Sequence, residues 1–334
     1  MELTGLHHVT AITARASANV DFYTRVLGLR LVKKTVNQDD VSAYHLFYAD
    51  GAGSPGTDMT FFDWDAIDPQ KLGAGQISMT AFRVPGKAAL THWGERFDEL
   101  GVSHGEVFER DGRATLAFSD PEGQQLELVD DSGAEVAGGE PWSRSTVPAA
   151  WGIRGLEGIT IAARSLERTE SVLLGVLGFR QSGEYFVDGN RAAVYATGAG
   201  GPGTEVRVVE RPDLPINVMN GAGGVHHAAF RTPNDEEQAE WHRRLTLAGL
   251  PVSSIIDRFY FHSIYFRIPG GVLFEIATDG PGFATDEPLD KLGESLALPP
   301  FLEPQRRQIE ANLKPLVTSG ASGASGASGS DSTG

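Results

Sequence analysis

The sequence predicts an α+β fold of four βαβββ modules whose sheets curl into two open barrels. Internal repeats carry this prediction. GLHHVT from Gly5 returns as GLEGIT from Gly155, and the glutamate of QQLELVD, Glu127, returns in VLFEIAT as Glu275. The intervals are 150 and 148 residues, and the repeated segments occur in the same order in both parts of the chain. Such spacing is typical of a duplicated supersecondary unit.

Each module is expected to open with a short strand, such as HHVTAIT, and to continue with a helix. In the first module the helix is predicted from Ala18 to Leu27, with Ser17 as N-cap and Gly28 as a left-handed end. Three strands separated by turn residues then complete the unit. The four modules are predicted at residues 4–66, 74–132, 151–211 and 221–280.

Two halves of two modules each account for most of the chain. Residues 136–150 lie in a stretch rich in Gly, Ser, Pro and Ala, which is typical of a linker. A helix is expected around Glu303–Leu313, and the small-residue repeat at the end predicts a disordered tail. The predicted divisions are an N-terminal half, a linker, a C-terminal half, an extension and a tail, at 1–135, 136–150, 151–285, 286–317 and 318–334.

Composition excludes several classes of function. The chain has no cysteine, so disulfides, thiolate metal sites and cysteine nucleophiles are absent. A net charge of −16 argues against a nucleic-acid partner. No stretch of about 18 apolar residues predicts a membrane span, and the N-terminus lacks a secretory pattern. We therefore expect a cytoplasmic protein without a membrane partner, and a homo-oligomer is compatible with the sequence.

Two histidine pairs distinguish the outer modules from the inner ones. His7-His8 opens the first module, where the third module has Glu157-Gly158. His226-His227 opens the fourth module, where the second has Ser78-Met79. A reactive residue that is present in one copy and absent from its twin is better explained by function than by folding. The pairs are therefore candidate metal ligands.

A glutamate completes the candidate site. Glu275 shares its module with a histidine pair, whereas its twin Glu127 does not and is the rival ligand. Two imidazoles and one carboxylate form a facial triad that leaves coordination positions open, and nitrogen and oxygen ligands suit Fe(II) or Mn(II). Neighbouring residues in a strand face opposite sides, so the pattern does not choose between the two histidines of a pair.

Several motifs resemble one protein family. The segment from Tyr265 to Glu275 reads Tyr-x-x-x-Pro-x-Gly-x-x-x-Glu, similar to the extradiol signature, with Ile268 where a polar residue is usual. GLHHVT and GGVHHAAFRT have the same character. With these motifs the chain resembles the vicinal oxygen chelate superfamily of glyoxalases, bleomycin-resistance proteins and extradiol dioxygenases. The resemblance is greatest to the hydroquinone 1,2-dioxygenase branch and spans residues 4 to about 316.

The resemblance also assigns residues to roles. It implies the vicinal oxygen chelate fold and a metal held by His8, His227 and Glu275. It implies that Tyr265 and Arg258 are catalytic residues that hydrogen-bond the substrate oxygens or the oxygen intermediate. It also implies that His7 and His226 are catalytic, as hydrogen-bonding or proton-transfer groups beside the ligands. The residues that it places around the bound ring are His7, Thr10, His226, Arg258 and Tyr265. His262 lies close to the signature and is a further candidate for substrate binding, while the remaining histidines are interpreted as structural or solvated, namely His45, His92, His104 and His242.

The implied activity is Fe(II)-dependent, extradiol-type cleavage of a hydroquinone or catechol, with O2 and a small aromatic diol as partners. The branch resembled, rather than any single residue, favours the para-diol. Two alternatives remain open from the residues. One is a glyoxalase-like metal-dependent isomerase or lyase, and the other is a non-catalytic protein of the same fold that binds aromatic ligands.

Overall fold

The computed structural model of this chain describes residues 1–132, 134 and 138–317, and it contains the four modules expected from the repeats. The first comprises β1 (Leu6–Thr13), α1 (Ala16–Asp21), the π-helix η1 (Phe22–Val26), β2 (Arg30–Asn37), β3 (Asp40–Ala49) and β4 (Asp58–Asp63). The second comprises β5 (Gln76–Val84), α2 (Lys87–Leu100), β6 (His104–Arg110), β7 (Arg113–Ser119) and β8 (Gln125–Asp130).

The other two modules repeat this order, with one extra short strand in the last. The third comprises β9 (Leu156–Ala163), α3 (Leu166–Gly175), β10 (Arg180–Val187), β11 (Asn190–Ala196) and β12 (Glu205–Glu210). The fourth comprises β13 (Val225–Thr232), α4 (Asp235–Leu247), β14 (Ile256–Asp257), β15 (Phe261–Arg267) and β16 (Leu273–Pro281).

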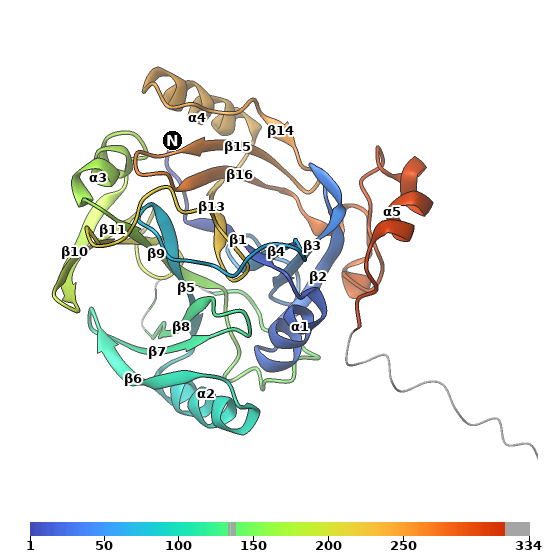
Figure 1. The fold of residues 1–334 in the computed structure, drawn as a ribbon, viewed down its shortest axis with the longest axis horizontal. Coiled ribbons are helices and arrows are strands. Elements are labelled where there is room, and N and C mark those ends of the chain that lie inside the picture. Colours follow the sequence, from blue (N-terminus) through green and yellow to red (C-terminus); the bar gives the residue numbers. More distant parts are fainter. Residues whose placement is uncertain (133, 135–137, 318–334) are drawn as a thin grey trace, which may run out of the picture.

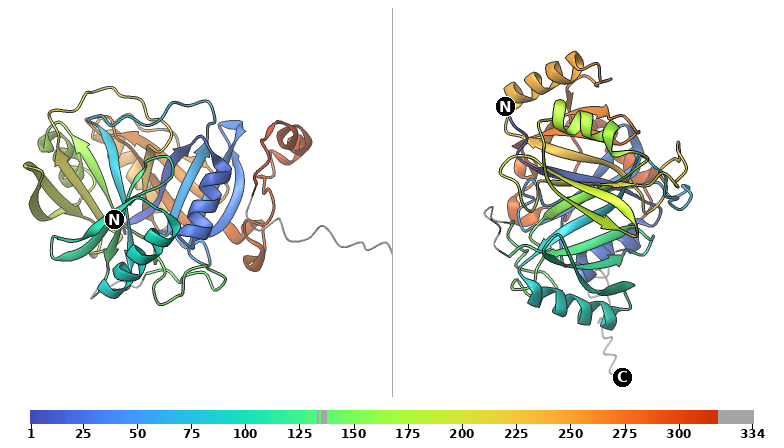
Figure 2. Two further views of the ribbon diagram at one scale, coloured as in Figure 1. Left: turned by 60° about the horizontal axis from the view of Figure 1, so that its bottom comes forward. Right: turned by 90° about the vertical axis from the view of Figure 1, so that its left-hand side faces the viewer.

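Two curled eight-stranded sheets are built from these modules (Figures 1 and 2). The first sheet has the order β14-β15-β16-β13-β1-β4-β3-β2 and joins the fourth module to the first. The second has the order β10-β11-β12-β9-β5-β8-β7-β6 and joins the third to the second. Each sheet therefore takes one module from each half of the sequence, and the helices lie on the outer faces of the sheets (Figure 1). The fold is the α+β arrangement that the repeats predict.

Strand register places the repeated residues at equivalent positions. In the first sheet Thr10 on β1 lies opposite His227 on β13. In the second sheet Thr160 on β9 lies opposite Met79 on β5, at the same intervals of 150 and 148 residues. Residues that are twins in sequence are thus twins in space. We call the concave interiors of the first and second curled sheets the first cup and the second cup. The side chains of the two cups can be compared position by position.

The first helix begins earlier than the sequence suggested. Its N-cap residue is Arg15, which makes no side-chain capping bond, so the prediction of Ser17 as the cap is wrong. Ser17 lies in the first turn, where its hydroxyl accepts a hydrogen bond from the Val317 backbone. Gly28 has the expected left-handed conformation, with φ of 72°, and a Cβ there would collide with Ser145.

The C-terminal extension packs against the first module. It follows the 3-10 helix η2 (Phe283–Thr285) and contains two further 3-10 helices, η3 (Leu289–Lys291) and η4 (Glu303–Gln305), and the helix α5 (Arg306–Asn312). The helix α5 agrees with the helix expected around Glu303–Leu313. Lys33 on β2 is fully buried beneath the extension, where its Nζ is 2.7 Å from Asp286 and also pairs with Glu287. The predicted tail, 318–334, lies outside the described residues.

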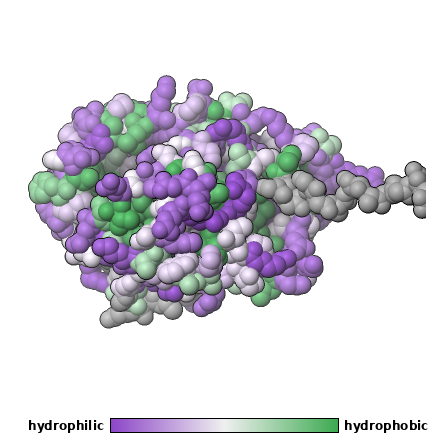
Figure 3. All heavy atoms as spheres, turned by 90° about the horizontal axis from the view of Figure 1, so that it is seen from below, coloured by the Kyte–Doolittle hydropathy of each residue, from purple (hydrophilic) through white to green (hydrophobic). Residues whose placement is uncertain are grey.

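The surface drawn in Figure 3 is mostly hydrophilic, and hydrophobic residues appear there in small separate groups. The apolar side chains are concentrated between the sheets and the helices, in a core that includes the fully buried Trp93 and Trp241. Throughout the described residues, no helix is long and apolar enough to cross a membrane.

We expect Lys33→Ala to lower the free energy of unfolding by about 3 kcal/mol, because removal of one partner leaves two carboxylates poorly compensated. Urea denaturation of the purified protein measures this value. Lys314→Ala is the control, since Lys314 pairs with Asp65 at the exposed surface and such pairs contribute less than about 1 kcal/mol. Equal losses in the two variants would show that the buried pair does not anchor the extension.

Candidate metal centre

Three side chains from adjacent strands of the first sheet converge on one point. His8 lies on β1, His227 on β13 and Glu275 on β16, and all three are buried. The Nε2 atoms of the two histidines are 3.3 Å apart. Glu275 Oε2 lies 3.3 Å from His8 Nε2 and 2.9 Å from His227 Nε2. The structure thus brings together the three residues that the sequence and the resemblance selected.

These distances fit a single bound cation. Ligand atoms at about 2.1 Å from one ion lie about 3.0 Å apart at right angles and about 3.4 Å apart in a tetrahedron. The observed separations of 2.9 to 3.3 Å lie within about 0.1 Å of this range. Although Glu275 Oε2 faces both imidazoles, it has no well-oriented hydrogen bond to any described residue. A metal ion would satisfy this buried oxygen and the two ring nitrogens together.

The ring of each candidate ligand histidine lies at hydrogen-bond distance from the ring of the histidine that precedes it in the sequence. Nδ1 of His7 is 2.9 Å from Nδ1 of His8, and Nδ1 of His226 is 2.8 Å from Nδ1 of His227. If the ligand ring donates from Nδ1, its Nε2 keeps a lone pair directed at the common point. Burial, together with the neighbouring His8, lowers the pKa of His7 to about 3. The same combination of burial and an adjacent ring, that of His227, lowers the pKa of His226 to about 3, so both outer rings are neutral at neutral pH and can accept from the ligand rings.

The carboxylate of Glu275 is held in its charged form. Burial alone would raise its pKa, but the imidazoles of His8 and His227 outweigh burial and hold the pKa well below the usual value. Its second oxygen, Oε1, accepts a hydrogen bond of 2.5 Å from Ser263 on β15. One oxygen is therefore fixed by the protein, and the other faces the two imidazoles.

A pocket opens directly onto two of the three candidate ligands, His8 and His227. Its walls combine aromatic rings with a few polar groups, contributed by His8, Thr35, Val36, Asn37, Gln38, Asp39, His45, Phe47, Phe62, His227, Arg258, Tyr260, Phe261 and Tyr265. Tyr265 is half-buried beside Glu275, and both desolvation of the phenol and that negative charge raise its pKa. Tyr265 therefore remains a hydrogen-bond donor at neutral pH.

Arg258 links the pocket to its rim. Its Nε donates to the Tyr265 hydroxyl at 3.3 Å, and its Nη2 donates to Asp39 at 2.9 Å. Gln38 also donates to the backbone oxygen of Arg258 at 2.9 Å. Asp39 and Gln38 belong to the turn between β2 and β3, whereas Arg258 follows β14. Since β2 and β14 are the two edges of the first sheet, these contacts close the curled sheet across the pocket mouth.

Other expected site residues lie outside the pocket wall. Thr10 is buried behind it, with its hydroxyl 2.8 Å from that of Thr60. The side chain of His262 forms an ion pair of 2.6 Å with Asp235 at the start of α4. Strand residues alternate between faces, so His262 points away from the side of β15 that carries Tyr265. This placement does not support the expected role of His262 in substrate binding.

His45 lies in the pocket wall, although the sequence interpretation treated it as structural or solvated. On β3 it faces Phe62 on β4, and the equivalent pair in the second sheet is Ala192 and Val209. The twin comparison could therefore have identified His45, because its counterpart is alanine. The signal was missed because the repeat is not recognisable in this part of the sequence.

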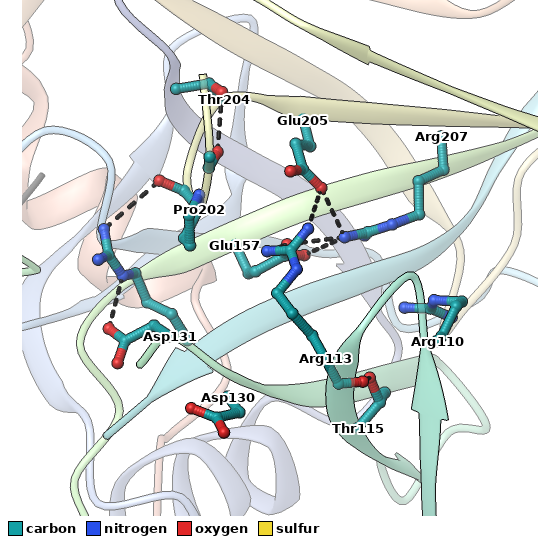
Figure 4. Close-up of polar contacts among 12 residues, drawn as sticks. Arg110, Arg113, Thr115, Asp130, Asp131, Glu157, Pro202, Thr204, Glu205 and Arg207 are labelled. Carbon is teal, nitrogen blue, oxygen red and sulfur yellow. Dashed lines mark hydrogen bonds and ion pairs between the residues drawn. The ribbon is translucent and has the colours of Figure 1, made fainter. Parts of the chain in front are cut away.

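The second cup contains charged pairs where the first has its ligands (Figure 4). Glu157, the twin of His7, accepts two hydrogen bonds of 2.7 Å from Arg207 and one of 2.6 Å from Arg113. Burial opposes ionisation of Glu157, but these arginines lower its pKa to about 2. The network is neutral overall, with three arginines and three glutamates, namely Arg110, Arg113, Arg207, Glu127, Glu157 and Glu205.

Glu127, the rival ligand, is fully engaged in this network. Both of its oxygens accept hydrogen bonds from Arg110, with 2.6 Å for the Oε1 contact. Met79 and Gly158 occupy the positions of His227 and His8, so no imidazole lies beside it at those positions. Within the described residues, the His8, His227 and Glu275 group is the one set of three that could hold a metal ion.

Comparisons with known proteins agree with this architecture. The chain belongs to the Glyoxalase/Bleomycin resistance protein/Dioxygenase superfamily, whose model matches residues 5–128 and 155–276. It is 47% identical over 317 residues to a Bacillus subtilis protein named ring-cleaving dioxygenase MhqA, covering 95% of this chain and 100% of that protein. It is 36% identical over 307 residues to the chlorohydroquinone/hydroquinone 1,2-dioxygenase of Sphingobium indicum, covering 90% and 92%. The chain is thus an enzyme of the ring-cleaving dioxygenase class.

Solved structures show the same fold. A dioxygenase from Bacillus subtilis is 39% identical, with a TM-score of 0.85, and the match covers 95% of this chain and 98% of that one. Glyoxalase I from Zea mays has a TM-score of 0.61 at 14% identity, covering 83% and 93%, which shows a shared fold alone.

We expect Glu275→Gln and His227→Ala each to retain less than about a tenth of the metal bound by the unaltered chain, because each removes one of three ligands. Glu127→Gln should retain the metal, since Glu127 pairs with Arg110 in the other cup. Elemental analysis after Fe(II) loading and desalting measures retention, and circular dichroism confirms folding. Equal metal loss in all three variants would place the site elsewhere.

Proposed function

We propose that this protein is an Fe(II)-dependent, extradiol-type dioxygenase that cleaves the ring of a hydroquinone or a catechol. The observation that supports this most is the convergence of His8, His227 and Glu275 at a pocket with aromatic walls. Three protein ligands leave room on an octahedral ion for both an aromatic diol and O2. A ring-cleaving dioxygenase needs both.

The ligand set favours iron among the candidate ions. Two imidazoles and a carboxylate suit Fe(II), with Mn(II) as the alternative, and this facial arrangement is typical of non-haem iron oxygenases. Bound Fe(II) would coordinate the diol and O2 and would carry electron density between them. Calcium is disfavoured because it prefers oxygen ligands alone.

The protein's own residues would bind and orient the ring. Phe62 and Phe261 line the pocket beside the ligands and would exclude water from the substrate ring. Tyr265, which stays protonated, would donate a hydrogen bond to a substrate oxygen. Arg258 lies against Tyr265 and would stabilise negative charge that develops on such an oxygen.

His7 and His226 are proposed to position the metal ligands rather than to touch the substrate. Neither lines the pocket that contains His8 and His227, and His226 faces a separate groove beside Trp64. Each accepts from the ligand ring next to it, which would fix the orientation of that ring and the direction of its free lone pair.

Hydroquinones are the favoured substrates. The relative from Sphingobium indicum, with 36% identity, is named for chlorohydroquinone and hydroquinone. Other relatives are named only as ring-cleaving dioxygenases, so catechols remain in the proposal.

The proposal is tested by O2 uptake from the anaerobically purified, Fe(II)-loaded protein. A panel of hydroquinones and catechols should cause stoichiometric O2 consumption and loss of the aromatic absorption band. Zinc or nickel in the purified protein, without O2 uptake, would support a glyoxalase-like isomerase instead. Binding of aromatic compounds without a bound metal would support a non-catalytic protein.

Tyr265→Phe should keep the metal and lower kcat by about 100-fold, because it removes one hydrogen-bond donor at the reacting oxygens. Steady-state O2 uptake, with metal content measured on the same sample, checks this. Tyr185→Phe is the matched control, since Tyr185 lies beside Arg110 in the second cup. If kcat is unchanged in Tyr265→Phe, the phenol has no part in the reaction.

A further inference from the structure

Two polar side chains with unused hydrogen-bonding capacity adjoin one another in the pocket wall. Thr35 on β2 and His45 on β3 are direct cross-strand partners, and both line the pocket. In the first sheet, β4 separates β3 from β1, which carries His8. Because the sheet is curled, β2 and β3 form a different wall of the pocket from the strands that carry the ligands.

The ring of His45 is held in place by its neighbours. Its Nε2 is 3.0 Å from the Thr60 hydroxyl, and its ring centroid lies 4.0 Å from that of Phe47 and 4.5 Å from that of Phe62. Its Nδ1 has no hydrogen-bond partner in the described part of the chain. Burial, with the added effect of His8 and His227, holds the pKa of His45 well below its usual value, so the ring is neutral.

The hydroxyl of Thr35 has no hydrogen-bond partner at all among the described residues. The Thr35 side chain is only 3% exposed. Buried polar groups in folded proteins almost always have a partner. A hydroxyl without one, in the wall of a binding pocket, indicates that a ligand provides the partner.

A ring diol offers a partner whose position depends on its substitution pattern. When one oxygen of the ring lies at the metal ligands, the second hydroxyl of a catechol lies beside it on the ring. The second hydroxyl of a hydroquinone lies at the opposite end of the ring. That hydroxyl can donate one hydrogen bond and accept others, which matches a threonine hydroxyl and a neutral imidazole nitrogen.

We propose that Thr35 and His45 bind the para-hydroxyl of the substrate, the one that does not reach the metal, and that they thereby determine a preference for hydroquinones over catechols. This inference rests on the proposed ring-cleaving function and specifies its substrate class. Thr60 is the positioning residue that orients the His45 ring, because its hydroxyl lies at hydrogen-bond distance from His45 Nε2.

Two variants remove these contacts with little change of shape. Thr35→Val replaces the hydroxyl by a methyl group, and His45→Phe keeps an aromatic ring between Phe47 and Phe62. Thr80→Val is the matched control. Thr80 is likewise fully buried, with a hydroxyl that has no partner among the described residues, but it lies on β5 in the second sheet.

The experiment is a calorimetric titration of the Fe(II)-loaded protein with hydroquinone and with catechol, in the absence of O2. We expect each pocket variant to weaken hydroquinone binding by about tenfold, the effect of one lost hydrogen bond, and to leave catechol binding unchanged. Thr80→Val should bind both as the unaltered chain does. The melting temperature of Thr35→Val should not fall, because the hydroxyl makes no bond within the described protein.

Equal weakening for both diols, or no weakening for hydroquinone, would overturn the assignment of Thr35 and His45. Failure of the unaltered protein to bind hydroquinone would overturn it as well. O2 uptake separates this outcome from failure of the proposed function. Selective hydroquinone binding without O2 uptake would contradict the ring-cleaving function but keep the para-hydroxyl site. Ring cleavage with unaltered selectivity in both variants would keep the ring-cleaving function but contradict the para-hydroxyl site.

Discussion

The candidate site depends on the pairing of β1 with β13. These strands come from the first and last modules, and their antiparallel register brings His8 and His227 to neighbouring positions. Glu275 joins them from β16, which lies parallel to β13. Neither half of the chain contains all three side chains, so the site exists only when the two halves share a sheet. The buried Glu275 oxygen and the two imidazole nitrogens then face one another, an arrangement that a cation stabilises.

The two cups show how one scaffold meets the same constraint in two ways. Polar groups inside a curled sheet are costly unless they are paired. In the second cup the buried charges are paired in a neutral network in which Arg207 and Arg113 surround Glu157. In the first cup several buried polar atoms have no hydrogen-bond partner among the described residues, among them Glu275 Oε2 and the Thr35 hydroxyl. The kind of side chain, rather than any difference in fold, separates the cup proposed to bind metal and substrate, which has two imidazoles and a carboxylate, from the cup that has paired arginines and glutamates.

Much of this could be predicted from sequence because duplication provides an internal comparison. The repeats predicted the four modules, and the absence of matching histidines in the inner modules selected the two histidine pairs as candidate ligands. The choice of His8 and His227 within the pairs came from the family resemblance. The pairing of modules could not be predicted, since it depends on contacts between distant strands. His262 was misplaced because closeness to Glu275 in sequence does not reveal which face of β15 it occupies. His45 was overlooked because its role depends on neighbours in adjacent strands and on a twin, Ala192, that only the register identifies.

The central claim is that three side chains hold one ion between β1, β13 and β16. Crystallography of the Fe(II)-loaded protein, with anomalous data collected on both sides of the iron absorption edge, tests it most directly. One anomalous peak within about 2.1 Å of His8 Nε2, His227 Nε2 and a Glu275 oxygen is the result that this structure predicts. A peak at any other group of side chains, with none between these three, would contradict it.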